Sequence, residues 1–218
     1  IIDGTQASST TISIIDAISD NNFDGVSDQT VSVTTTDDDV AGFTVAETNG
    51  GTSVAESGNT DTFTIVLDKG PLTDVVFTIT SADTGEATVT STLTFTSVNW
   101  DTPQTVTVTG ADDDIIDGTE STEISIAIDD ANSNDSFDSL ANQSVSVTTT
   151  DDDVAGFTVA ETNGGTSVAE SGNTDTFTVV LNAQPDSDVV FSISSGDTGE
   201  ATVTSTLTFT SANWDTTQ

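Results

Sequence analysis

The sequence predicts an all-β chain built of tandem antiparallel β-sandwiches of the immunoglobulin-like type. Apolar residues alternate with Thr and Ser, which is typical of strands with one face in a core and the other in water. Short turn-rich segments separate these runs, and no stretch shows the spacing of a helix. A long internal repeat then indicates that one sandwich follows another along the chain.

The internal repeat divides the chain into units. Residues 1–104 match residues 115–218 without gaps, so the period is 114 residues, and Val31–Thr64 recurs letter for letter as Val145–Thr178. A unit of this length suits one sandwich. The predicted division is the C-terminal strands of a preceding repeat at 1–39, a complete repeat at 40–153, and the first five strands of a following repeat at 154–218.

Within the complete repeat, the alternation predicts strands that would pair into two packed sheets. The aromatic residues Phe43, Phe63, Phe77 and Phe95 fall on the apolar side of their strands and are expected in the core. The predicted strands are Gly42–Glu47, Asp61–Leu67, Asp74–Thr80, Glu86–Thr90, Thr92–Thr96, Gln104–Thr109, Ser121–Ile128 and Gln143–Thr149.

The charge balance of the chain restricts its partners. Lys69 is the one basic residue against 37 acidic residues, and the formal net charge is −36. Binding to nucleic acid or to an anionic membrane requires basic residues, so nucleic acid is excluded and such a membrane surface is disfavoured. Membrane insertion is not expected either, because the apolar runs are only a few residues long. Cations are the expected partners, because they relieve the repulsion between carboxylates.

The available side chains then restrict the choice of cation. The chain has no Cys and no His, so only hard oxygen ligands remain. Calcium accepts six to eight such oxygens in irregular geometry, whereas magnesium demands a stricter octahedron. The aspartate triads 37–39 and 151–153 can turn several carboxylates inward only in a loop. Calcium binding is therefore predicted, and a solvated turn is the alternative for either triad taken alone.

Three stretches together resemble the Calx-beta family, the calcium-binding sandwich of sodium–calcium exchangers that is repeated in many bacterial surface proteins. They are Ser53–Gly58, Gly110–Glu120 and Val145–Asp153, and Ser91–Thr96 followed by Gln104–Val108 looks like the family's fifth and sixth strands. The resemblance spans the whole repeat. It implies that these stretches converge at one end of the sandwich and bind several calcium ions beside the linker to the next domain.

The resemblance also implies which residues are the ligands. An early glutamate, an acidic loop with the acidic residue that follows it, and a terminal aspartate cluster match the family pattern. Thr84–Glu86 departs from it, because the family usually has a Gly-rich, aromatic-containing segment there, and the number of ions per junction stays open. The implied ligands are Glu56, Asp83, Asp112, Asp113, Asp114, Asp117, Glu120, Asp151, Asp152 and Asp153, with Asp3, Asp37, Asp38, Asp39, Glu170 and Asp197 at equivalent places in the flanking repeats.

Near-identical tandem copies favour a structural role over a sensory one. We expect a calcium-rigidified repeat of a large bacterial extracellular protein, such as an adhesin, a surface layer or a filament at the cell surface. The alternatives are a calcium sensor coupled to a transporter and a module in which Trp100 binds cell-surface glycans or a protein partner. An enzyme is not expected, because the carboxylates occur in runs suited to metal and no Ser–His or Cys–His pair is available.

The partial repeats at the two ends raise a further expectation about partners. Each would leave strand edges unpaired and a core half covered, which favours association. We therefore expect these parts to contact neighbouring repeats of a longer array, or to meet other copies of the chain head to tail.

Overall fold

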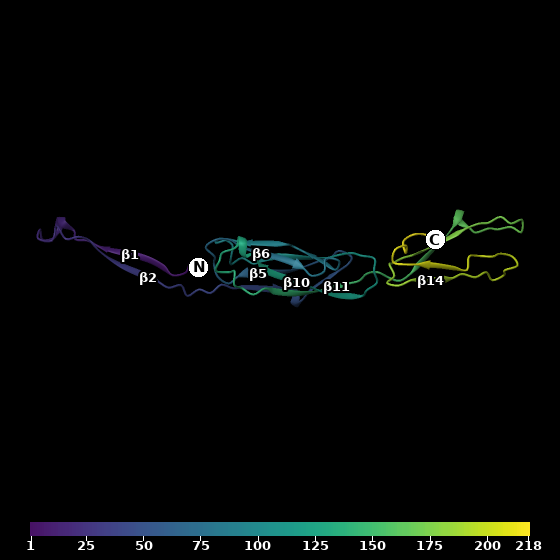
Figure 1. Ribbon diagram of the computed structural model, residues 1–218, viewed down its shortest axis with the longest axis horizontal. Coiled ribbons are helices and arrows are strands. Elements are labelled where there is room, and N and C mark those ends of the chain that lie inside the picture. The colour runs from purple at the N-terminus through teal and green to yellow at the C-terminus, as the bar shows by residue number, and fades with distance from the viewer.

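The computed structural model describes all residues from Ile1 to Gln218. An N-terminal hairpin, a central sandwich and a C-terminal pair of small sheets follow one another along an elongated molecule (Figure 1). The all-β fold class predicted from the sequence is confirmed. No helix in the structure has the length and apolar character needed to cross a membrane.

The central sandwich consists of a five-stranded and a four-stranded sheet. The five-stranded sheet holds, in spatial order, β4 (Thr52–Ala55), β11 (Gln143–Thr150), β10 (Thr119–Ile128), β6 (Val75–Ser81) and β8 (Thr92–Phe95). The four-stranded sheet holds β3 (Phe43–Glu47), β5 (Thr60–Leu67), β9 (Gln104–Gly110) and β7 (Ala87–Val89).

The core lies between these two sheets and contains the predicted aromatic residues. Phe63, Phe77 and Phe95 are fully buried, and Phe43 is 7% exposed. Phe77 packs edge to face against Phe43 at 5.0 Å and against Phe95 at 5.7 Å, measured between ring centroids. Phe137, from the loop after β10, is also fully buried in this core. The core predicted from the strand alternation is therefore confirmed.

Strand β4 is the main difference from the predicted strands. Its four residues are flanked by turn-forming sequence, and four residues are too few for alternation to stand out. The strand pairs in parallel with β11, with Ala55 opposite Thr150, whereas all other strand pairs are antiparallel. Val54 is only 1% exposed, which shows that β4 contributes to the core as a regular strand.

The flanking parts contain two-stranded sheets. In the hairpin, β1 (Gln6–Ile12) pairs with β2 (Gln29–Thr35). After the central sandwich, the chain forms four strands where five were predicted, because the equivalent of β7 is not a strand. In the central repeat β7 pairs with β9, and 154–218 contains no equivalent of β9. The four strands are β12 (Phe157–Glu161) with β13 (Phe177–Leu181), and β14 (Val189–Ser192) with β15 (Thr206–Phe209).

Four short 3-10 turns complete the secondary structure. They lie in connections and bury no residue, so they add little to the core. Their bounds are Asp16–Ile18 (η1), Thr48–Gly50 (η2), Asp130–Asn132 (η3) and Thr162–Gly164 (η4).

Candidate metal centre

Several acidic segments meet at one end of the central sandwich. The parallel pairing of β4 with β11 creates this meeting point, because it places Glu56, the residue after β4, beside Asp151, the residue after β11. The Glu56 N–H continues this pairing by donating to the Thr150 carbonyl at 3.1 Å. Strand β9 ends equally close: a Cβ at Gly110 would lie 1.9 Å from the Ala55 carbonyl oxygen, so only glycine fits there.

Glu56 is the most deeply buried carboxylate of the chain. Only 1% of the residue is exposed, and its Oε2 is buried without a hydrogen-bond partner. Burial raises its pKa to about 7, and the negative charges of Asp113, Asp151 and Asp117 add to this shift. A buried, unpaired carboxylate is strongly unfavourable unless a cation or a proton compensates its charge.

The carboxylates around Glu56 form two groups. Oxygens of Glu56, Glu86 and Asp117 lie within 4.8 Å of one another, and so do oxygens of Glu56, Asp113 and Asp153. Glu56 belongs to both groups. Two adjacent cation positions that share Glu56 would match this arrangement.

Two further carboxylate oxygens in these groups also lack partners. Glu86 Oε2 and Asp153 Oδ2 are buried and accept no hydrogen bond. Burial raises the pKa of Glu86, of Asp117 and of Asp153, and neighbouring carboxylates add to each shift. In all these groups, burial and neighbouring negative charges disfavour the ionised carboxylate. A bound divalent ion would stabilise the ionised form of all of them.

Asp151 differs from these residues, because its carboxylate holds the linker in place through hydrogen bonds. Its Oδ2 accepts the Gly118 N–H at 2.9 Å, and its Oδ1 accepts the Asp153 N–H at 2.7 Å. Asp37 repeats this arrangement at the preceding junction, where its Oδ2 accepts the Gly4 N–H at 2.8 Å. Backbone N–H groups accordingly lower the pKa of Asp37. The first aspartate of each triad thus fixes the loop before the hairpin to the linker after it.

Besides Asp83 and Asp151, four predicted ligands of the complete repeat lie outside both groups. Asp112, Asp114, Glu120 and Asp152 are all exposed. Three of them still act on the site through charge, because Asp114 and Asp152 help to raise the pKa of Asp153 and Glu120 that of Glu86. The structure therefore brings together Glu56, Asp113, Asp117 and Asp153 from the predicted set, with Asp151 beside them.

Asp83 shapes the turn before Glu86 and belongs to neither group. Its Oδ1 accepts the Gly85 N–H at 2.9 Å. Glu86 itself was not among the predicted ligands. Its carbonyl accepts the Ala111 N–H at 2.9 Å, which holds the residue against the acidic loop after β9. The available signal was its place as the first residue of the predicted strand Glu86–Thr90, at the same end of the sandwich as the acidic loop.

The equivalent residues of the flanking repeats do not form such groups. Glu170 and Glu200, the equivalents of Glu56 and Glu86, line one open cavity of about 480 Å³. Asp197 caps its turn through the Gly199 N–H at 2.9 Å, as Asp83 does. In the hairpin, Asp3 and Asp38 are exposed, and Asp37 and Asp39 hold hydrogen bonds or ion pairs at the linker.

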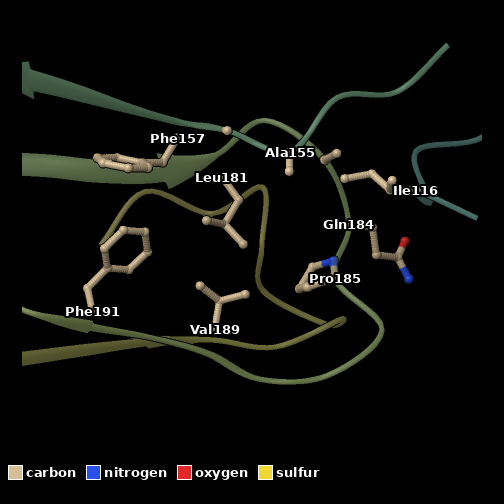
Figure 2. Close-up of a pocket in the computed structure, with 10 residues that line it drawn as sticks. Ile116, Ala155, Phe157, Leu181, Gln184, Pro185, Val189 and Phe191 are labelled. Carbon is tan, nitrogen blue, oxygen red and sulfur yellow. The ribbon is translucent and has the colours of Figure 1, made fainter.

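The segment between Asp113 and Asp117 also contacts the next repeat. Ile116 lines a mostly apolar pocket of about 420 Å³ together with Ala155 and Pro185 of the next repeat (Figure 2). Beside it, the Gln184 N–H donates to the Asp114 carbonyl at 2.6 Å. The equivalent residue packs more tightly at the first junction, where Ile2 is 7% exposed within the core cluster of the central repeat, whereas Ile116 is 40% exposed. One loop therefore carries both acidic ligands and the apolar contact.

The tryptophans have structural positions. Trp100 is partly buried and packs against the core of the central repeat, and its carbonyl accepts the Leu67 N–H at 3.1 Å. Trp214 packs in the same way against the small core of Val179, Leu181 and Phe209. These contacts account for both residues without a glycan ligand.

Comparison with known proteins finds no matching family model and no matching curated protein. Solved structures with a similar arrangement include domains 4 and 5 of the S-layer protein SbsC (26% identity, TM-score 0.33, 58% of this chain and 54% of that chain). They also include the apo form of the Calx CBD1 domain (15% identity, TM-score 0.34, 51% and 98%) and CBD12 from CALX1.2 (15%, 0.35, 77% and 71%). The chain thus spans about half the length of the SbsC structure. At these TM-scores the likenesses assign no family to the chain.

Proposed function

We propose that this chain is part of a structural, extracellular array of β-sandwich repeats in which calcium ions stiffen the junctions. The observation that carries this proposal is the buried Glu56 carboxylate, which has an unpartnered oxygen and belongs to two groups of carboxylates. The partial likeness of its sequence to the Calx-beta family points in the same direction.

The residues present fit calcium. Glu56, Glu86 and Asp117 would hold one ion, and Glu56, Asp113 and Asp153 a second. All ligands are hard oxygens from different loops, a set that suits a large cation with irregular coordination. Bound calcium would supply the positive charge that compensates these carboxylates. Because Asp113 and Asp117 flank Ile116, that charge would also hold in place the loop that contacts the next repeat.

A structural role fits this site better than a catalytic one. A general acid also needs a buried carboxylate with a raised pKa, and Glu56 has one. The carboxylates nearest to it, however, are grouped as ligands of a cation would be, and the chain has no His or Cys to complete a Ser–His or Cys–His pair. We therefore propose that the chain is not an enzyme.

Calcium titration by calorimetry tests the proposal. The intact chain is expected to bind calcium at the Glu56 site, and Glu56→Gln should weaken that binding at least about tenfold, or 1.4 kcal/mol, because both positions lose a shared charged ligand. Glu170→Gln is a matched control: Glu170 has the same neighbours in sequence but is exposed and belongs to neither group. Absence of calcium binding to the parent chain would refute the proposed function.

The apolar contact of Ile116 gives a test of stiffening. Ile116→Ser should broaden the range of distances between the central and third repeats in calcium, because the junction loses an apolar side chain that lines the pocket between them. Spin labels on cysteines introduced at the exposed Ser97 and Ser211 measure this by pulsed electron paramagnetic resonance, since the chain has no other cysteine. Ile18→Ser, at a residue 83% exposed in the hairpin, is the control. An equally narrow distribution in Ile116→Ser would contradict the stiffening role of this contact.

A further inference from the structure

The two copies of the repeat differ most in the loop that contacts the preceding repeat. Residues 40–104 and 154–218 differ at 11 of 65 aligned positions, and five of these lie within the six-residue loop 68–73 and its equivalent 182–187. The segments around Glu56 and Glu86 are identical to those around Glu170 and Glu200. The loop differences are Asp68 to Asn182, Lys69 to Ala183, Gly70 to Gln184, Leu72 to Asp186 and Thr73 to Ser187.

At the first junction this loop supplies a positive charge. Lys69 Nζ lies 2.7 Å from Oδ1 of Asp39, the last aspartate of the first triad. Lys69 is the one basic residue of the chain, and the α-ammonium group of Ile1 lies 2.8 Å from Oδ2 of the same carboxylate. Hydrogen bonding to Lys69 is the largest cause that lowers the pKa of Asp39, to about 2.

At the second junction the same place has no positive charge. Asp153 is the equivalent of Asp39, and Ala183 is the equivalent of Lys69. Asp153 Oδ2 is buried without a partner, and the carboxylate lies in one group with Glu56 and Asp113. The two junctions thus have the same linker aspartate, compensated in one by the ammonium groups of Lys69 and Ile1 and uncompensated in the other.

We propose that the residue at position 69 or 183 decides which cation closes each junction: the fixed ammonium of Lys69 at the first, and a divalent metal ion at the second. The proposal rests on the proposed function for the metal half of this choice. An ammonium group beside the linker aspartate takes up one of its oxygens and repels a divalent ion, so the two cations exclude each other. A repeat with Lys at this place makes the junction before it independent of calcium, and a repeat with Ala leaves that junction dependent on calcium.

The test converts the second junction into the first. Ala183→Lys is compared in the full chain with Ala183→Met, which has a similar length and no charge. The Lys side chain must extend to the surface, as the 45% exposed side chain of Lys69 does. We expect Ala183→Lys to bind calcium at least about tenfold more weakly than Ala183→Met, and to melt at a higher temperature than Ala183→Met in chelator.

Two results separate this inference from the proposed function. Equal calcium affinity and equal melting of the two variants would overturn the inference while leaving calcium binding intact. If the parent chain binds no calcium, the proposed function fails, and the melting comparison in chelator still decides the ammonium half of the inference. In an Asp153→Asn background the stabilisation by Lys should disappear, because its partner is gone, and a gain that persists there would also overturn the inference.

Discussion

Excess calcium should raise the melting temperature of the central repeat by at least about 10 °C relative to chelator. A ligand that binds only the folded state stabilises it by about 2.7 kcal/mol per site at a hundredfold excess over Kd. For a domain of this size each kcal/mol corresponds to about 4–8 °C. The effect should be large because the ions compensate carboxylates that are buried and unpartnered without them, chiefly Glu56, Glu86 and Asp153.

Fluorescence of Trp100 isolates this transition. Trp214→Phe removes the other tryptophan of the chain, so the remaining signal reports the central repeat, against whose core Trp100 packs. Magnesium at the same concentration should give a smaller shift because it demands stricter octahedral geometry. Glu56→Gln should lose most of the calcium effect. A melting temperature that is the same in calcium and in chelator would exclude calcium as a stabilising ligand.

The strand pattern of the repeat was predictable because alternation is a local property. Long strands such as β5, β9 and β10 bury every second residue, and the sequence shows this directly. Strand β4 was not predictable in this way, because it has four residues and its pairing with β11 joins segments about a hundred residues apart. Its parallel pairing nevertheless sets the position of Glu56.

The aspartate runs show why acidic composition alone predicts more metal ligands than the structure brings together. In an extended segment, neighbouring side chains point to opposite sides, so a run of three cannot direct all its carboxylates to one site. In 112–114 only the middle residue, Asp113, faces the site. In 151–153 the outer two, Asp151 and Asp153, face inward and Asp152 is exposed. Which residues of a run face the site depends on the backbone conformation with which the loop leaves its strand, and the sequence does not show this.

Glu86 was missed for a related reason. It follows an ordinary turn sequence, and nothing nearby in the chain marks it as a ligand. Its role depends on β7 lying beside β9, which brings the residue before β7 next to the acidic loop after β9. The resemblance to a known family did not help here, because Thr84–Glu86 is the stretch where this sequence departs from the family pattern.

The metal-free chain should lose stability as the pH rises from about 4.5 to about 7. The pKa of Glu56 is raised from 4.5 to about 7 in the folded state, so the folded state holds its proton more tightly than the unfolded state does. This contribution is fully present below pH 4.5 and is lost as the pH rises through the folded pKa. Glu86, Asp117 and Asp153 also have raised pKa values and should act in the same direction.

Melting temperatures in metal-depleted buffer between pH 4.5 and 7.5 measure this effect. Glu56→Gln should flatten the decline in melting temperature with pH. This variant should also melt above the parent chain at pH 7.5, because a neutral side chain replaces the most deeply buried carboxylate. Glu170→Gln should follow the parent chain throughout. In saturating calcium the decline should vanish in the parent chain, since the ions favour the ionised carboxylates and oppose their protonation. A metal-free parent chain whose stability rises over this pH range would mean that Glu56 is already compensated by another group, and would remove the main physical reason for a metal at this site.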